Sequence, residues 1–283
     1  MNRRDLVLGG AVGLAAAGAA SAQAPKAPAA KESAPYVPSN YGQTLEIMFT
    51  TSTDLNAFMP PGLTAVDPHR AFIKAERIKL RSPASDKMPA AFTQYDQICI
   101  TTMATTSEFG PRHRNILMWE DRAWAVGSTL LAVKRWGKVQ MTQVFELDHK
   151  LVAQGTPVPV YVTVEQDGHA LMTFSGTLDG QKRVEHPAYP GFYVGGDPGQ
   201  DLQALTLDAS TFARPVYGAG TLNFGNNPAD RGPAGPGKGW SASLLKDIEV
   251  QGCVFQDFSF TRSYGTEFQT VRKALPGNGR SRL

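Results

Sequence analysis

The 283-residue sequence has few of the features that mark the common functional classes. Its two cysteines are too few to staple a fold of this size, and its five histidines lack the spacing of metal ligands. The 28 basic and 25 acidic side chains leave a net charge of +3 and no long basic stripe, which argues against a nucleic-acid partner. No GxSxG motif, phosphate-binding glycine loop or dinucleotide fingerprint is present. No metal or other cofactor is therefore expected.

Long hydrophobic runs are also missing, apart from a segment at the N-terminus. The apolar stretch 6–20 is short for a bilayer span, follows Arg3-Arg4 and leads into Ala20-Ser21-Ala22. This pattern resembles a twin-arginine export signal. We therefore expect cleavage after Ala22, a mature protein in the periplasm and no stable membrane anchor after cleavage. The alternative is an anchor that stays attached.

Proline and glycine divide the rest of the chain. Residues 1–22 are the expected signal peptide, and residues 23–40 read as a Pro/Ala-rich linker. Residues 41–275 form the folded body, without a composition break that would divide it, and residues 276–283 form a flexible tail. The 28 Gly and 20 Pro residues suit many short strands and turns better than a helical bundle.

Inside the body, hydrophobic residues mostly alternate with polar ones, which predicts β-strands. The expected strands cover residues 45–49, 71–78, 97–101, 115–119, 139–147, 160–165, 171–174, 220–224, 248–250 and 254–262. Asp167-Gly168 is a hairpin turn signal between two of them. Only two helices are expected, a short one over residues 53–58 capped by Thr53 or Asp54, and a longer one from Asp121 to about Lys134. The expected fold is mainly β (α+β) and antiparallel, with one notable helix.

Cys99, Cys253 and His113 have ordinary explanations. Both cysteines lie on apolar strand patterns, so buried inert thiols are the simpler interpretation, although the two could pair if their strands were neighbours. His113, between two arginines, fits a solvated turn as well as an anion contact.

A group of cations is the strongest candidate for chemistry. Lys134, Arg135 and Lys138 flank Trp136 at the end of the expected helix, whose residues 124–133 are mostly apolar. Bases at a helix C-terminus ordinarily offset the negative end of the helix dipole and stay in water. Alternatively, an apolar pocket with a second cation lowers the pKa of a lysine amine. The neutral amine can then attack a carbonyl group and form a Schiff base.

Several stretches resemble the acetoacetate decarboxylase family, in the family's order. They are residues 115–127, Asp54-Leu55 with 59–63, residues 220–225 with 227–230, and Asp257-Phe258. The resemblance covers nearly all of the body. It implies a cone-shaped antiparallel β-barrel, assembly into homo-oligomers, and a small-molecule carbonyl substrate. It also implies that Lys134 is the Schiff-base lysine and Arg135 the cation that lowers its pKa.

The resemblance also points to further site residues and shows departures from the family. Phe92, Tyr95, Trp119 and Trp136 are the expected lining of the substrate pocket. Gln94 falls where the family carries a glutamate, so it can donate a hydrogen bond but cannot exchange a proton.

Two more departures affect the expected site. From Gly127 to Lys134 the chain is one residue shorter than the family pattern, and without a gap Arg135 would take the lysine position. Lys138 is the reserve nucleophile. The family's arginine before the first strand has no counterpart near residues 41–43, so a group that recognises a substrate carboxylate is missing.

Three hypotheses follow. The first is an exported Schiff-base lyase that acts on a carbonyl compound other than acetoacetate, either as an oxo acid decarboxylase or as an aldolase-dehydratase. The second is a periplasmic β-barrel that binds a small apolar or aromatic ligand without turnover. The third, ranked last, is a hydrolase or isomerase with Asp96, Glu120 or Asp121 as its base.

Overall fold

The computed structural model describes residues 39–81, 92–120, 134–135, 139–143, 155–166, 168–185, 190–196, 201–206, 209–225, 242–261 and 268–273. All of them lie in one compact unit, Pro35–Leu283. The expected signal peptide and tail, and the linker up to residue 38, lie outside the described residues. The first strand begins at Ser39, just before the expected start of the folded body.

Strands make up almost all of the described structure. They are β1 (Ser39–Thr50), β2 (Thr64–Ala65), β3 (Arg70–Arg81), β4 (Phe92–Thr105), β5 (Arg112–Glu120), β6 (Lys134–Arg135), β7 (Val139–Gln143), β8 (Val158–Gln166), β9 (His169–Leu178), β10 (Gly191–Gly195), β11 (Leu202–Thr206), β12 (Ala209–Phe224), β13 (Glu249–Thr261) and β14 (Phe268–Arg272). Two short 3₁₀ helices, η1 (Leu55–Phe58) and η3 (Ala242–Leu244), complete the described elements. Among the described residues, no helix is long and apolar enough to cross a bilayer.

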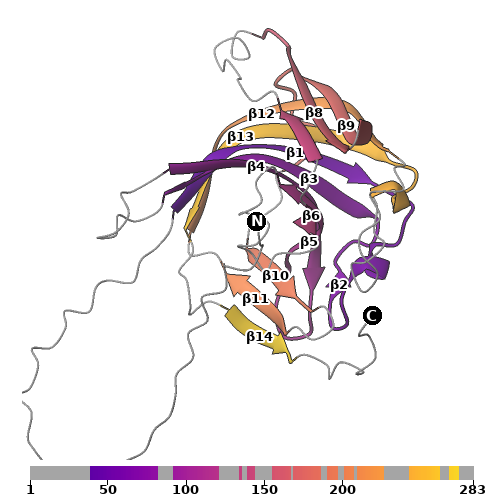
Figure 1. Cartoon of the computed structure of the whole chain (residues 1–283), viewed down its shortest axis with the longest axis vertical. Helices are drawn as coiled ribbons and strands as arrows, with labels where there is room; N and C mark the ends of the chain where they lie inside the picture. The colour runs from indigo at the N-terminus through magenta and orange to yellow at the C-terminus, as the bar shows by residue number, and fades with distance from the viewer. Residues whose placement is uncertain are drawn as a thin grey trace, which may run out of the picture. The chain divides into compact units, whose positions relative to one another are not determined.

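The strands belong to one 14-stranded sheet in the order β14-β11-β10-β5-β4-β3-β1-β13-β12-β9-β8-β7, with β2 beside β4 and β6 beside β5. Most neighbours are antiparallel as expected, whereas β5 pairs in parallel with β6 and β10. Figure 1 shows that the sheet bends, with β10, β11 and β14 below the long strands β1, β3 and β13 in this view. Within the described residues the path is open, because β14 and β7 each have one partner. The expected closed barrel is not confirmed.

Alternating hydrophobicity predicted the long strands correctly. β1, β3, β4, β5, β8 and β9 each contain a predicted strand, and Gln166 pairs with His169 across the predicted hairpin turn. β10, β11 and β14 were missed because they are short, and because β10 is buried along its whole length and so shows no alternation.

The two expected helices have different outcomes. The first is present as η1, and the Asp54 side chain accepts a hydrogen bond from the Asn56 backbone N–H at 2.9 Å, as a helix cap does. The second was wrong at its C-terminal end, because Lys134 begins the strand β6 and pairs with Met118 of β5. Residues 121–133 lie outside the described residues.

The main core lies on one side of the sheet. Leu45, Ile73, Ile98, Trp119 and Phe174 are at most 1% exposed and share the largest apolar cluster, together with residues of η1 and η3. Each fully buried side chain of this kind contributes about 1.5–3 kcal/mol to stability. This cluster therefore holds both halves of the sheet together.

One glycine of β1 allows the strands to approach closely. A Cβ atom at Gly42 would lie 1.9 Å from the Arg77 carbonyl oxygen of β3. Only glycine therefore fits at this position without a shift of the backbone.

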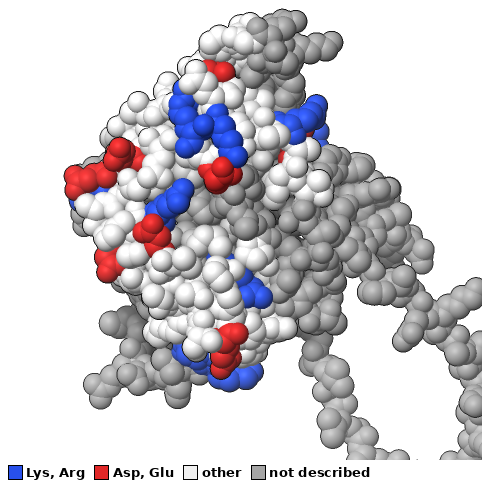
Figure 2. All heavy atoms as spheres, turned by 180° about the vertical axis from the view of Figure 1, so that it is seen from behind, with Lys and Arg blue, Asp and Glu red and all other residues white. Residues whose placement is uncertain are grey.

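The described surface carries charges of both signs close together. Figure 2 shows Lys and Arg side chains beside Asp and Glu rather than in one broad stripe on this face. Exposed ion pairs include Lys182–Glu185 at 2.7 Å and Lys273–Asp201 at 3.0 Å. Exposed pairs of this kind contribute little to stability.

Candidate active site

The two faces of the sheet differ in chemistry around β1, β3 and β4. Side chains alternate along a strand, so neighbouring residues lie on opposite faces. Leu45, Ile73 and Ile98 point into the main core, and we call this side the apolar face. The residues between them include Glu46 and Lys74, so the opposite side is called the polar face. The polar face is where the candidate site lies.

Six polar side chains are buried on the polar face of four adjacent strands. This buried polar cluster consists of Thr44, Glu46, Lys74, Glu76, Gln97 and Gln256, which are between 0% and 9% exposed. Polar and ionisable groups are rarely buried to this extent unless they are paired or functional. The cluster is therefore the strongest candidate for a functional site within the described residues.

Strand pairing arranges the cluster in two lines across the sheet. In the first, which we call the acid-amide row, Gln97 pairs with Glu76, Glu76 with Thr44, and Thr44 with Gln256. In the second, Glu46 of β1 stands directly opposite Lys74 of β3. Cross-strand partners project to the same face with Cβ atoms about 4.5–5.5 Å apart. The charged and amide groups therefore converge on one small area.

Glu76 has the most perturbed surroundings in the cluster. Burial raises the pKa of its carboxyl group, and this effect outweighs the lowering by the positive charge of Lys74 and by the hydrogen bond that Gln97 Nε2 donates to Glu76 Oε2. The negative charge of Glu46 adds to the increase in pKa. Glu76 thus keeps its proton to a higher pH than an exposed glutamate does.

The polar face is concave around Lys74. Lys74 Nζ lies 4.7 Å from the centre of the Phe192 ring, although β3 and β10 are separated by β4 and β5 in the sheet. The His113 ring packs edge-on between Phe72 and Phe192, at centroid distances of 5.1 and 5.6 Å. Such contacts across the sheet require that it curve toward this face. His113 is fully buried in β5, so the solvated-turn interpretation was wrong.

Apolar clusters close the polar face at both ends. Towards one end of the strands, Met48, Phe72, Val184 and Val254 pack together. Towards the other end, Ile78, Tyr95 and Phe258 form a second cluster. The polar cluster between them is shielded from water along the strand direction, which strengthens the interactions of its charges.

Lys134 is aligned with this site through strand register. Lys74 pairs with Cys99, Cys99 with Met118, and Met118 with Lys134. We call Glu46, Lys74, Cys99, Met118 and Lys134 the register line. The expected Schiff-base lysine therefore occupies a position on the same line of the sheet as the buried charges.

Comparisons with known proteins bear on this fold. No protein-family model matches the chain, and no curated protein matches it in sequence. An acetoacetate decarboxylase-like enzyme from Sphingomonas wittichii RW1 superposes with a TM-score of 0.63 at 12% identity, over 83% of this chain and 93% of that chain. The chain has the acetoacetate decarboxylase-like fold.

Other enzymes with this fold give similar matches. The enduracididine biosynthesis enzyme MppR complexed with pyruvate has a TM-score of 0.64 at 17% identity, over 86% of this chain and 93% of that chain. Acetoacetate decarboxylase from Legionella pneumophila has a TM-score of 0.55 at 12% identity, over 83% of this chain and 88% of that chain. The expected mainly β, acetoacetate decarboxylase-like fold is thus confirmed, whereas its closed barrel and its notable helix are not.

The structure separates the expected site residues of this fold. Tyr95 lies on the polar face, whereas the Trp119 side chain is buried in the main core on the apolar face. The backbones of Phe92 and Gln94 are in β4, and Gln94 pairs with Lys79. Arg135 follows Lys134 in β6, where it pairs with Trp119. Trp136 and Lys138 lie outside the described residues.

The sequence analysis missed the buried polar cluster. Its signal was present as charged residues at alternate positions of strongly apolar strands, in Leu45-Glu46-Ile47 and in Ile73-Lys74-Ala75-Glu76. That alternation is also typical of a strand with one face in water, so it gave no reason to expect buried charges. The curvature of the sheet decides between the two interpretations.

The carboxylates that sequence analysis considered as bases are engaged elsewhere or not described. Arg77 donates two hydrogen bonds to Asp96, at 3.0 and 3.2 Å. Asp257, which belongs to the family resemblance and was not a candidate base, accepts from Arg214 Nε at 2.6 Å and from Gln43 Nε2 at 3.4 Å. The side chain of Glu120 and the whole of Asp121 lie outside the described residues.

The two cysteines lie far apart in the sheet. Cys99 is in β4 and Cys253 in β13, with β3 and β1 between them, and both are buried and outside any disulfide. Burial raises the pKa of Cys253 to about 12. The expected burial of both thiols is confirmed, and the strand order keeps them too far apart for a disulfide.

Proposed function

We propose that the protein is a lyase that forms a Schiff base between Lys134 and a small carbonyl substrate. The observation that carries this proposal is the register line, which aligns Lys134 with buried charges on the concave face of an acetoacetate decarboxylase-like fold. A buried, shielded site is what an amine needs in order to lose its proton near neutral pH.

The proposed reaction uses only the lysine amine, the substrate, protons and water. The neutral Lys134 amine adds to the substrate carbonyl carbon, and the resulting carbinolamine loses water to give an iminium. The electron pair of the neighbouring C–C bond moves into the iminium, which releases carbon dioxide from a β-oxo acid and leaves an enamine. The enamine takes up a proton, and water then frees the product and the lysine. In the aldolase-dehydratase variant the iminium instead loses a proton from the carbon beside it and becomes an enamine. The enamine carbon adds to the carbonyl carbon of an aldehyde, and the aldehyde oxygen takes up a proton. The new hydroxyl group then leaves as water, together with a proton from the carbon between the two former carbonyl carbons, and hydrolysis frees the product and the lysine.

Neighbouring residues take supporting roles in this proposal. Arg135 is the neighbouring cation in β6, where strand alternation assigns it to the opposite face from Lys134, so its charge acts on the pKa of the Lys134 amine only across the strand. Tyr95 borders the pocket, whereas Gln94, at the next position of β4, belongs to the opposite face by strand alternation and takes no role in it. Glu76 is the group in the buried polar cluster suited to deliver a proton, because burial raises the pKa of its carboxyl.

Oxo acids are the substrates to test first. MppR has been solved with pyruvate and with the condensation product of pyruvate and imidazole 4-carboxaldehyde, and it shares this fold. Acetoacetate itself is not proposed, because Gln94 stands where the family carries a glutamate and residues 41–43 contain no arginine.

Borohydride trapping tests the proposal. The purified protein is incubated with pyruvate, 2-oxobutanoate or acetylacetone and reduced with borohydride. Its mass is then measured by intact mass spectrometry. One adduct per chain is expected for the wild type and for Lys138→Ala, and none for Lys134→Ala. If no carbonyl compound is trapped by the wild type, the Schiff-base mechanism is wrong and the ligand-binding hypothesis takes its place.

Export and assembly into a homo-oligomer belong to the same proposal. We propose that the chain is exported by the twin-arginine route and cleaved after Ala22, because residues 1–22 carry that signal pattern. N-terminal sequencing of the periplasmic protein tests the cleavage site. We also propose a homo-oligomer, since the open strand edges need cover, and light scattering after gel filtration measures its mass.

A further inference from the structure

Two buried polar atoms of the acid-amide row have no hydrogen-bond partner among the described residues. They are Thr44 Oγ1 and Gln256 Nε2, on side chains that are 0% and 1% exposed. A buried donor without a partner is destabilising, and native proteins rarely keep one without a reason. Here two such atoms belong to cross-strand partners on the same face.

One further hydrogen-bonding group could satisfy Thr44 Oγ1 and Gln256 Nε2 together. Thr44 stands directly opposite Gln256, so their side chains are neighbours, yet neither satisfies the other. The Gln256 amide nitrogen can only donate a hydrogen bond, and the Thr44 hydroxyl can donate or accept one. An oxygen atom that accepts from both satisfies both at once.

The surrounding charges select an uncharged oxygen. Lys74 faces Glu46 in the neighbouring line, so one positive charge stands opposite one negative charge. Burial raises the pKa of Glu76, the next member of the row beside Thr44, above that of an exposed glutamate. Lys74 is the cation of the buried polar cluster and already faces Glu46, so a second carboxylate beside Glu46 would share that one cation, whereas a hydroxyl or carbonyl group adds no charge.

We propose that Thr44 and Gln256 form a recognition subsite for an uncharged oxygen, a hydroxyl or keto group, on the distal part of the carbonyl substrate. This inference deepens the proposed function and rests on it for the identity of the substrate class. Glu46, Lys74 and Lys134 share the register line, so the subsite and the proposed nucleophile belong to one face of the sheet. The number of carbons between the oxo group and the distal oxygen of the preferred substrate then reports the distance between Lys134 and the subsite.

The test compares pairs of 2-oxo acids that differ only by a hydroxyl in place of a methyl group. The pairs are 4-hydroxy-2-oxobutanoate with 2-oxopentanoate, 5-hydroxy-2-oxopentanoate with 2-oxohexanoate, and 6-hydroxy-2-oxohexanoate with 2-oxoheptanoate. Calorimetric binding is measured on Lys134→Ala, which forms no imine, and borohydride trapping is measured on the wild type. At one chain length the hydroxyl compound should bind about tenfold tighter or more than its methyl partner.

Two variants and two control variants test whether the preference for the hydroxyl compound depends on Thr44 and Gln256. Thr44→Val and Gln256→Met keep the shape of the side chains and should abolish the preference while leaving the methyl compounds unaffected. Thr221→Val and Gln251→Met make the same chemical changes at exposed positions of β12 and β13 and should retain it. Thermal unfolding verifies that each variant is folded before binding is compared.

The outcomes separate this inference from the proposed function. The inference is wrong if no chain length shows a hydroxyl preference, in which case the two atoms hold only water, or if the preference persists in both Thr44→Val and Gln256→Met. The hydroxyl preference could be observed and abolished by the two substitutions although the wild type traps no oxo acid. That result would support the subsite and contradict the Schiff-base mechanism.

Discussion

Glu46 and Lys74 face each other on the paired strands β1 and β3, and neither side chain is more than 2% exposed. Removing two charges from water carries a large desolvation penalty, which their mutual attraction only partly offsets. A pair of this kind adds little to stability when it is compared with an apolar pair. Its presence at the centre of the polar face therefore favours a functional role.

Loss of one member of this pair should be far more harmful than loss of both. Lys74→Met leaves the buried Glu46 without the opposite charge and should reduce the free energy of unfolding by about 3–5 kcal/mol. Lys74→Met combined with Glu46→Leu should recover most of that loss. Urea unfolding of the four proteins of the double-mutant cycle measures the coupling. Additive losses would show that the two side chains do not interact.

Glu76 should make stability depend on pH in a defined direction. Its pKa in the folded protein is raised from 4.5, so the folded state holds its proton more tightly than the unfolded state. Stability is therefore lost as the pH rises from about 4.5 through the raised value. Glu76→Gln keeps the neutral shape and removes this loss. Its advantage in unfolding free energy over the wild type should grow with pH and then level off, whereas a constant difference would contradict the raised pKa.

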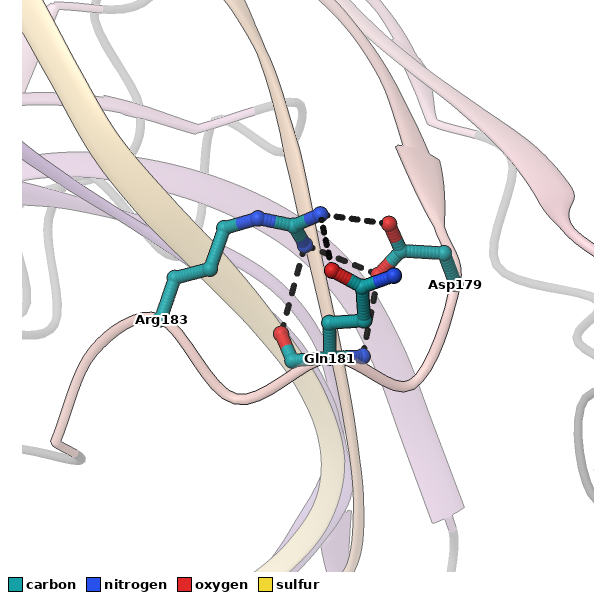
Figure 3. Close-up of polar contacts among 3 residues, drawn as sticks. All are labelled: Asp179, Gln181 and Arg183. Carbon is teal, nitrogen blue, oxygen red and sulfur yellow. Dashed lines mark hydrogen bonds and ion pairs between the residues drawn. The ribbon is translucent and has the colours of Figure 1, made fainter.

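The ion pair Asp179–Arg183 should have the opposite pH dependence. Figure 3 shows Arg183 reaching across the turn after β9 to Asp179 and Gln181, with Nη1 and Nη2 at 2.8 and 2.6 Å from the two carboxylate oxygens. Arg183 holds the pKa of Asp179 at about 2, against an ordinary value of 3.8. Its contribution is thus present above about pH 4 and is lost as the pH falls toward 2.

A matched variant checks this turn. Asp179→Asn should lower the unfolding temperature slightly at pH 6 and not at pH 2, because the pair is partly exposed and contributes modestly. Asp201→Asn, at another surface pair, is the control for loss of a single exposed charge. An equal effect of Asp179→Asn at both pH values would show that its carboxylate pairing is not what stabilises the turn.

Thr44 and Gln256 should show a conflict between stability and binding. Thr44→Val removes a buried hydroxyl that has no partner in the described structure, so the ligand-free protein should become more stable by about 1 kcal/mol. The same change should weaken binding of hydroxylated oxo acids. Thermal melts with and without ligand measure both effects. A Thr44→Val protein that is less stable without ligand would indicate that the hydroxyl already has a structural partner.

The long strands could be predicted from the sequence because each carries its own alternating pattern. β1 and β3 read clearly from residues 45–49 and 71–78 alone. β10 could not be predicted in this way, since it is buried throughout and its place beside β5 depends on pairing Phe192 with His113, far apart in the chain. Short strands that are fixed by such distant partners leave little local signal.

The candidate site was also predictable only in part, because some of its features depend on residues far apart in the chain. Lys134 was found from the cations around it, but the expectation that it ends a helix was wrong, because pairing with Met118 makes it part of a strand. Glu46, Lys74 and Glu76 resembled the outer side of a half-buried strand. The curvature of the sheet brings Phe192, three strands away, to the Lys74 amine, and this curvature cannot be read from a local pattern.

The position of the trapped carbonyl adduct tests the central claim most directly. The protein is reduced with borohydride in the presence of an oxo acid, digested, and the modified lysine is located by tandem mass spectrometry. We predict that the adduct lies on Lys134 and that it disappears in Lys134→Ala but not in Lys138→Ala. An adduct on Lys74 or Lys138 in the wild type, or none on any lysine, would contradict the proposed Schiff-base mechanism.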